Sequence, residues 1–332
     1  EAYLAPDKPL LIDEYLGHAT ELDVDAAADG EQVLVGAIME HLEQAGIHSG
    51  DSTCFIPTQN ISQEMLKRVD EQTRIIGLKL KIKGCYNIQF AIQGDNLYCL
   101  EVNPRSSRTV PFVAKSTGLP MARIAARITI GIPLSQQEIP RRTTGHVCVK
   151  APVFPFIKLR GLDPAPGPEM KSTGEVFGSD IRADLAYLKA RLATEIPVAT
   201  EGGAYLTVRE EDKAALVPIA QSLIDINFTI FATPGTADVL RKANIPVTTS
   251  YRIAERMHPD SLDLMRKGDV NFIVNVPTIS GGAVRDGNMM RRLAVELNIP
   301  FVTTMRGAVM EVAAMKARLE NNLEPRRLEV HY

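Results

Sequence analysis

The chain has 332 residues, enough for two domains, and 45% of them are hydrophobic, so a sizeable core can be buried. A formal net charge of −3 argues against a nucleic-acid-binding protein, and no apolar run approaches the roughly 18 residues that a membrane span requires. Four scattered cysteines without a CxxC pair are typical of free thiols in the reducing cytoplasm, and no signal peptide is recognisable.

The first part of the chain predicts strands, a loop and a helix. Residues 9–40 contain an apolar run, the alternating stretch TELDVDAAAD and, after a turn, a β-branched stretch, all typical of strands. Residues 41–59 lack periodicity and carry two glycines, which predicts a loop. Residues 60–81 repeat apolar positions at close to helical spacing, so a helix is expected there with Asn60 or Ser62 as its N-cap.

Two strand-like runs, NIQFAI and LYCLEVN, flank a short QGDN turn and predict a β-hairpin. A helix is expected over residues 119–131, and the Pro- and Gly-rich stretch after it predicts a connector. From Gly203 onward, five short apolar strands alternate with helices, which is the signature of a doubly wound parallel sheet. The chain is therefore divided into a first domain, a connector and a second domain, over residues 1–140, 141–200 and 201–332.

Polar residues at the end of the hairpin suggest a metal and phosphate site. Glu101 and Asn103 are two apart on a strand and share a face, and a three-residue turn would set Gln89 opposite Glu101. Three oxygen donors, one of them anionic, suit a hard cation such as Mg²⁺ that also binds phosphate oxygens. Arg105 and Arg108 follow immediately and could clamp a phosphate or carboxylate.

The plainer alternative is a surface hairpin with solvated polar groups, because an isolated E-x-N is common. A second polar cluster upstream favours the site. Glu21 is either an exposed charge or an acceptor for ribose hydroxyls, and GIHSGDS is either a flexible loop or one whose backbone approaches a nucleotide. His41 and His48 are assigned no proton transfer.

A family resemblance rests on four stretches that occur in the same order: EHLEQAGIHSGDS, NIQFAI, EVNPRSSRTVPFVAKSTG and GPEMKSTGEVFG. They resemble the C-terminal half of the large subunit in the carbamoyl phosphate synthetase family, which contains an ATP-grasp domain. The resemblance implies ATP-dependent phosphorylation of carbamate to carbamoyl phosphate, with Mg²⁺ or Mn²⁺ and a potassium ion. It also implies a glutamine-hydrolysing, cytoplasmic enzyme with a glutaminase small subunit. The chain opens on Glu1 in mid-flow, so we expect a fragment that is inactive without the upstream part of the large subunit.

The resemblance also implies roles for individual residues. The divalent-metal ligands would be Gln89, Glu101 and Asn103. The contacts to ATP would be the Leu16 backbone, Glu21, Gly46, Ile47, His48, Ser49, Gln89 and Glu101. The potassium ligands would be His41, Glu43 and Gln44. The catalytic arginines that hold the acyl phosphate would be Arg105 and Arg108.

The second domain resembles the methylglyoxal-synthase-like regulatory domain of the same subunit, a Rossmann-like fold, so the whole chain is expected to combine α+β and α/β architecture. ATPGTADVL places hydroxyls and amides between a strand and a helix N-terminus, an arrangement that binds anions. A tight βα turn is the alternative. Matching family positions favour a pocket for an allosteric nucleotide effector, formed by Lys213, Thr233, Gly235, Thr236, Asn275, Thr278 and Thr304.

Departures from the family leave the effector open. NVPTISGG and TSYRIAE differ from the loops of relatives that bind nucleoside monophosphates, and the absence of Trp argues against an N-acetylglutamate site. Ala151 stands where ornithine-sensing relatives carry a Glu, although Glu43, Asp51 and Thr304 could still line that site. The alternatives are another ATP-grasp ligase, such as a biotin carboxylase relative, and a stand-alone nucleotide-sensing module. A methylglyoxal synthase is disfavoured, because the relevant loops lack a convincing pair of catalytic aspartates.

Overall fold

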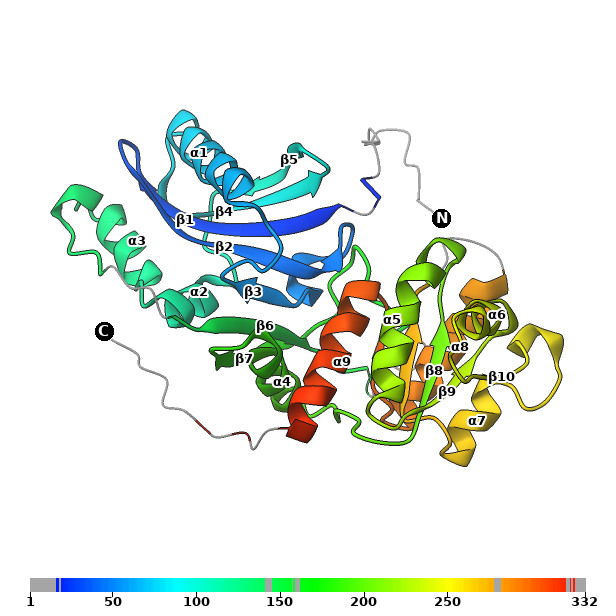
Figure 1. The fold of residues 1–332 in the computed structure, drawn as a ribbon. Coiled ribbons are helices and arrows are strands. Elements are labelled where there is room, and N and C mark those ends of the chain that lie inside the picture. Colours follow the sequence, from blue (N-terminus) through cyan, green and yellow to red (C-terminus); the bar gives the residue numbers. More distant parts are fainter. Residues whose placement is uncertain are drawn as a thin grey trace, which may run out of the picture.

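Two β-sheets organise the chain (Figure 1). The computed structural model describes residues 16–17, 19–140, 145–156, 158, 162–277, 282–320, 323 and 325. Within them, the first sheet is antiparallel and has seven strands in the order β5-β4-β1-β2-β3-β6-β7. In that order the strands are Asn96–Asn103, Lys83–Gln93, Thr20–Asp29, Val33–Gln44, Cys54–Ile56, Val147–Val153 and Gly174–Asp180.

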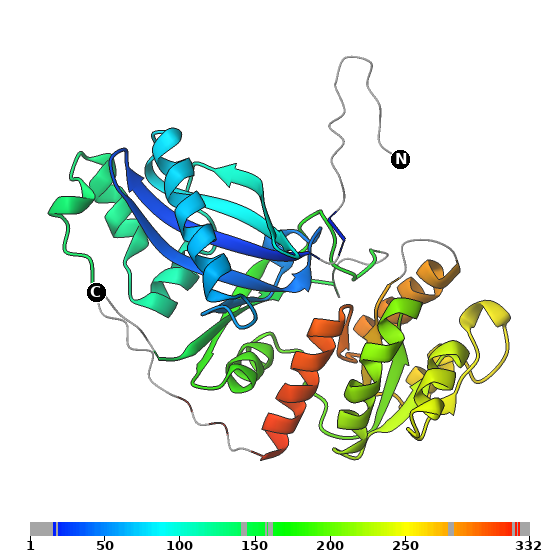
Figure 2. The same ribbon diagram turned by 45° about the horizontal axis from the view of Figure 1, so that its top comes forward.

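The alternating sequence of β1 gives the first sheet two different faces. Leu22, Val24 and Ala26 pack under helix α1 (Gln63–Lys79), which lies along the strands in Figure 2. The predicted N-cap of this helix is confirmed at Ser62, whose hydroxyl accepts a hydrogen bond from the Met65 amide at 3.2 Å. The opposite face carries the carboxylates of β1 and is partly covered by helices α2 (Val110–Thr117) and α3 (Met121–Thr129).

Two segments differ from their expected structure. Residues 41–44 continue β2 and residues 54–56 form β3, although a loop was expected over 41–59. These strand pieces are too short to show periodicity, and β3 is ordered by pairing with β2 and β6. The expected connector contributes β6 and β7 to the first sheet, together with helix α4 (Ala183–Ala193), which packs against these two strands. Gly178 permits this packing, because a Cβ there would lie 2.2 Å from the Ala186 carbonyl oxygen on α4.

The second sheet is the doubly wound parallel sheet that the alternation from Gly203 predicts. Its strand order is β10-β9-β8-β11-β12, over Thr248–Thr249, Thr229–Ala232, Gly203–Thr207, Phe272–Asn275 and Phe301–Val302. Helices α5 (Lys213–Ile224), α6 (Pro234–Lys242) and α9 (Met305–Glu320) contribute to the core on one face. Helices α7 (Ser261–Lys267) and α8 (Gly282–Glu296) contribute to the core on the other. No helix in the described part of the chain is both long and apolar enough to span a bilayer.

The two sheets share one hydrophobic core. Val149 of β6, Tyr187 of α4, Leu216 of α5 and Val312 of α9 belong to a single cluster of buried residues. Helix α9 accordingly lies between the two sheets in Figure 1 and packs against α4. The second domain is therefore built onto the first through a continuous apolar contact, rather than joined by a linker alone.

A buried polar cluster fixes the contact between α4 and α9. The Glu311 carboxylate is fully buried and accepts hydrogen bonds from the Tyr187 hydroxyl at 2.7 Å and from Arg191 Nε at 2.9 Å. Burial, followed by the charge of Glu311, raises the pKa of Tyr187 well above its usual value, so the phenol stays protonated and donates.

We expect Glu311→Ala to lower the free energy of unfolding by about 3–5 kcal/mol, because Arg191 would be left buried without its partner. Glu320→Ala, an exposed position on the same helix, is the matched control and should change it by less than about 0.5 kcal/mol. Urea denaturation of both variants measures the difference. Equal effects would show that the cluster does not hold the two domains together.

Candidate active site and effector pocket

The hairpin pairs Gln89 with Glu101 as expected, but its turn and its strand register differ from those expected. The turn between β4 and β5 has two residues, since Gln93 pairs with Asn96. A β-bulge then shifts the register, so that Phe90 pairs with Cys99 and Gln89 pairs with Glu101. Directly paired residues in an antiparallel sheet point to the same face, so Gln89, Glu101 and Asn103 present three side-chain oxygens on one side of the sheet.

Asp25 anchors the loop that carries the two arginines. Its carboxylate is 1% exposed and accepts hydrogen bonds from the hydroxyls of Ser107 at 2.7 Å and Thr109 at 2.6 Å and from Asn87 Nδ2 at 2.9 Å. Burial raises the pKa of Asp25 in spite of these bonds. Two of the three hydroxyls in the RSSRT stretch, those of Ser107 and Thr109, therefore fix the loop after β5 against β1.

The arginines themselves lie at the surface of the site. Arg105 donates through Nη2 to Asn103 Oδ1 at 3.3 Å, so it stands beside an expected metal ligand. Arg108 contacts Met170, which belongs to the loop before β7. Both side chains are exposed and able to reach an incoming anion.

The loop over residues 46–51 lies between the hairpin and the second domain. The Gly46 amide donates to Glu21 Oε1 at 3.0 Å, and Gln89 Nε2 donates to Ser49 Oγ at 3.0 Å. Ser49 therefore joins the expected ATP-binding loop to the expected metal site. Gly46 and Ile47 instead line a cavity of about 280 Å³ that faces the second domain and also includes Gln44. The Leu16 carbonyl accepts a hydrogen bond from the Ala19 amide at 3.4 Å.

His41 is enclosed by carboxylates. Its Nε2 lies 3.2 Å from Asp23 Oδ2 and its Nδ1 lies 3.5 Å from Glu21 Oε2, and all three residues are buried. Burial lowers the pKa of His41, but the neighbouring Cys54, Asp23 and Glu21 outweigh it and hold the pKa well above its usual value. A protonated imidazole has no lone pair for a cation, so a potassium ion here would have to use Glu43 or backbone oxygens rather than the His41 ring.

Lys150 is a site residue that the sequence reading missed. It is 1% exposed on β6, and its Nζ donates to the Ser49 carbonyl oxygen at 3.1 Å. Burial lowers its pKa, but the neighbouring Cys54, Glu175, Asp23 and Glu43, in that order, outweigh this effect, so the ammonium remains charged. The signal in the sequence is a lysine in the middle of the apolar strand VCVKAPV, where a charge needs a buried partner.

Five of the seven expected effector residues meet in a cavity of about 380 Å³ at the carboxyl ends of β8, β9 and β11. Thr233 is the N-cap residue of α6, and Thr236 is buried in the first turn of that helix. A Cβ at position 235 would lie 2.9 Å from Lys213 Nζ, so glycine lets the lysine approach this helix N-terminus. The expected residues that line the cavity are Lys213, Thr233, Gly235, Thr236 and Asn275.

The rest of this cavity differs from expectation. Thr278 lies outside the described residues. Thr304 does not line the cavity, because it follows the edge strand β12 and accepts the Gly307 amide at 3.0 Å as α9 begins. Arg209, Arg252 and Asp286 line it instead and were not anticipated.

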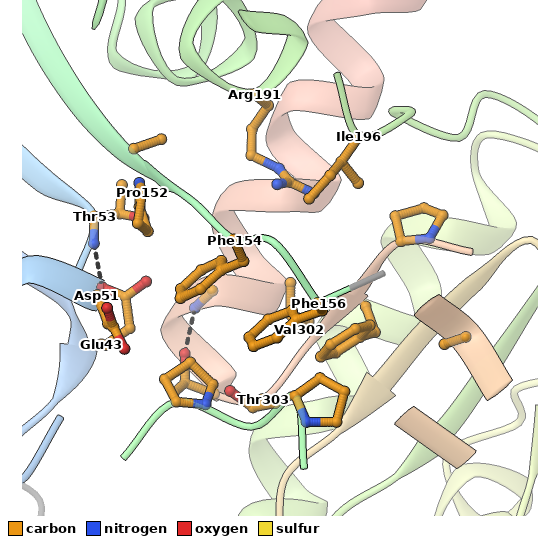
Figure 3. A pocket seen from close by; sticks show the side chains of 18 of the residues that line it. Glu43, Asp51, Thr53, Pro152, Phe154, Phe156, Arg191, Ile196, Val302 and Thr303 are labelled. Carbon is orange, nitrogen blue, oxygen red and sulfur yellow. Dashed lines mark hydrogen bonds between the residues drawn. The ribbon is translucent and has the colours of Figure 1, made fainter. Parts of the chain in front are cut away.

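Thr304 contributes to a third cavity, of about 180 Å³, between the two domains (Figure 3). This cavity brings together Glu43, Asp51, Ala151 and Thr304, the set considered for an amino-acid effector. Burial raises the pKa of Glu43, and both oxygens of Asp51 accept backbone amides of the loop before β7, at 2.8 and 2.9 Å. Phe154 and Phe156 also line this cavity, and their rings are stacked with centroids 4.7 Å apart.

Comparison with known proteins finds two family matches. Residues 3–137 match the family described as the carbamoyl-phosphate synthase L chain, ATP binding domain, and residues 215–303 match the MGS-like domain. The carbamoyl phosphate synthase large chain of Methanosarcina barkeri is 44% identical over 311 residues, which cover 93% of this chain and 78% of that protein. The chain belongs to the carbamoyl phosphate synthase large-chain family.

Other members of the family are longer. The large chain of Methanocorpusculum labreanum is 43% identical over 98% of this chain but only 30% of its own length. The C-terminal section of the large chain of Methanocaldococcus jannaschii is 43% identical over 95% of this chain and 52% of its own length. This chain thus spans about a third to a half of these two relatives. Among solved structures, the biotin carboxylase subunit of a pyruvate carboxylase is 14% identical, with a TM-score of 0.43 over 55% of this chain and 46% of that one, which is too remote to bear on function.

For this member of the carbamoyl phosphate synthase family, we expect Thr109→Val to lower the free energy of unfolding by about 2–3 kcal/mol, because a buried hydrogen bond to a carboxylate is lost. Thr117→Val is the matched control, since that hydroxyl makes only local bonds and none to a carboxylate: it donates to the Val113 carbonyl at 2.8 Å and accepts the Leu119 amide at 3.2 Å. Urea denaturation should show a smaller loss for the control. Similar losses for both variants would contradict the anchoring role of Asp25.

Proposed function

We propose that the first domain supplies one wall of the site at which ATP phosphorylates carbamate to carbamoyl phosphate in the whole large chain. The observation that carries the proposal is the bulged pairing of Gln89 with Glu101, which sets three oxygen donors beside Arg105 and Ser49. Family membership favours this activity over that of another ATP-grasp ligase, because 44% identity extends over 93% of the chain. A stand-alone sensing module would have no use for a metal-binding hairpin.

The donor set fits a divalent cation. One carboxylate and two amide oxygens on one sheet face are the ligands that hard cations accept, and the site would leave room for phosphate oxygens. Gln89, Glu101 and Asn103 would hold Mg²⁺ or Mn²⁺. The ion, when bound, would neutralise charge on the phosphates of ATP.

The remaining chemistry requires positioning rather than proton transfer. Carbamate is already an anion, so its attack on the γ-phosphorus needs no general base. Arg105 and Arg108 would bind the oxygens of the phosphoryl group and the acyl phosphate, and they offer planar, paired donors for this task. Asp25 would keep the two arginines in place through Ser107 and Thr109.

We expect Glu101→Gln to weaken the binding of ADP with Mn²⁺ by about 10- to 100-fold, because the one anionic ligand is lost. Glu64→Gln, an exposed position on α1, is the control and should leave the affinity unchanged. Isothermal titration calorimetry of the chain measures both. Wild-type affinity in Glu101→Gln would remove this residue from the metal site.

We propose that the cavity at β8, β9 and β11 binds the phosphate of an allosteric nucleotide. Lys213 and the N-terminus of α6 offer positive charge and hydrogen-bond donors at one end of the cavity. Arg252 and Asp286 also line the cavity and would contact the remainder of the nucleotide, so they would decide which base or sugar is accepted.

We expect one of UMP, IMP or UTP to raise the melting temperature of the wild-type chain, and Thr236→Ala to lose most of that shift. The hydroxyl of Thr236 lies in the phosphate-binding turn, and its loss should weaken binding about tenfold or more. Thr229→Ala, an exposed position at the start of β9, is the control. The effector proposal fails if no nucleotide shifts the wild type, or if Thr236→Ala responds like the control.

We infer that the whole large chain works in the cytoplasm with a glutaminase small subunit that supplies ammonia, as its family suggests. A potassium ion near Glu43 and Gln44 would be bound by carboxylate and carbonyl oxygens. The His41 ring would not take part, because it is paired with the carboxylates of Glu21 and Asp23.

A further inference from the structure

Arg291 on α8 is the largest completely buried side chain in the described part of the chain. Its Nε and Nη2 donate to the two carboxylate oxygens of Asp163, at 2.9 and 2.6 Å. Its Nη1 donates to Asn275 Oδ1, at the end of β11. One buried guanidinium therefore joins a wall of the effector cavity to the loop that precedes β7.

The bond to Arg291 determines which end of the Asn275 amide is available. A guanidinium has donors only, so the amide must turn its oxygen toward Arg291. The amide Nδ2 is then the atom that remains to meet a ligand, and it suits a phosphate or carbonyl oxygen. Gly287 makes room for this contact, because a Cβ there would lie 2.8 Å from Arg291 Nη1 and 3.1 Å from Asn275 Oδ1.

The other partner of Arg291, Asp163, belongs to a loop that is closed by hydrogen bonds of its own. We call residues 162–172 the connecting loop. Lys171 Nζ donates to the carbonyl oxygens of Asp163 at 3.1 Å and Ala165 at 2.6 Å, which closes the loop on itself. Displacement of Asp163 would therefore move the loop as a unit.

The connecting loop is bonded directly to the loop over residues 46–51. The Gly167 carbonyl accepts the His48 amide at 2.8 Å. The Asp51 carboxylate accepts the amides of Lys171 at 2.8 Å and Ser172 at 2.9 Å. A continuous set of hydrogen bonds thus runs from Asn275 in the effector cavity to the loop whose Ser49 contacts Gln89.

We propose that Arg291 is a positioning residue that aims the Asn275 amide at the effector and, through Asp163 and the connecting loop, links effector binding to the position of the loop over residues 46–51. This inference rests on the proposed effector function. A ligand that takes a hydrogen bond from Asn275 changes the balance of contacts around Arg291, and this differential contact is what coupling between two sites requires.

The test combines calorimetry with hydrogen–deuterium exchange on the 332-residue chain, with UMP, IMP and UTP as probes. In the wild type, the nucleotide that binds should slow amide exchange at least threefold in peptides that cover 46–51 and 162–172. Asp163→Asn should bind that nucleotide within about threefold of the wild type, yet lose the change over 46–51, because the connecting loop is released. Asn keeps an oxygen that can accept from Arg291 but removes the charge beside a buried guanidinium, so some stability is lost, and thermal melting establishes that the variant is folded before exchange is compared.

Arg291→Lys should weaken binding of the same nucleotide about five- to tenfold, since lysine keeps the charge but cannot hold Asp163 and Asn275 together. Arg292→Lys, the exposed neighbour on the same helix, is the matched control and should behave as the wild type. Wild-type affinity in Arg291→Lys, or an unchanged exchange response in Asp163→Asn, would overturn the inference while leaving the effector pocket in place. Absence of nucleotide binding by the wild type would instead refute the proposed effector function, and this inference with it.

Discussion

The alternating carboxylates of β1 are the constraint on which the rest of the first domain depends. Glu21, Asp23 and Asp25 are at most 7% exposed, and a buried carboxylate without partners is strongly unfavourable. Each one therefore orders a different part of the site: Glu21 receives the Gly46 amide, Asp23 pairs with His41, and Asp25 holds the hydroxyls beside the two arginines. The geometry of the site follows from satisfying three buried charges.

The second domain takes part in that arrangement. Arg306, at the start of α9, donates to the buried carboxylate of Glu40 on β2 and to the Thr20 hydroxyl on β1. The same Glu40 accepts the amides of Gln59 and Asn60 ahead of α1. Because α9 also lies in the core shared by both sheets, a shift of the second domain would disturb strands that carry the candidate active site. The packing of the two domains thus provides a physical basis for regulation.

The sequence predicted regular elements well and long-range contacts poorly. The period of β1, the start of α1 and the parallel second sheet all follow from local patterns. The sequence also predicted that Gln89 faces Glu101, but for the wrong reason. A three-residue turn was expected, whereas the actual turn has two residues and a β-bulge supplies the missing one-residue shift in register. The lysine inside the apolar run of β6 signals a buried partner for Lys150 but does not identify Ser49, which is 101 residues away in the chain. The pairing of Arg291 with Asp163, 128 residues away, has no local signal at all. Thr304 was wrongly assigned to the effector cavity. Its match to a family position did not reveal that it follows the edge strand β12, away from β8, β9 and β11.

The loop over residues 46–51 is the element through which these observations meet. Its first residue is bonded to Glu21, its serine to Gln89, and its last residue to the backbone of the connecting loop. It also borders two cavities at the contact between the domains, one through Gly46 and Ile47 and one through Asp51. A segment held from several sides has few alternative positions, so a ligand in either cavity could change its position only by exchanging one set of hydrogen bonds for another. Such exchange would alter the contact between Ser49 and Gln89, and in this way binding far from the hairpin would reach the proposed metal-binding face.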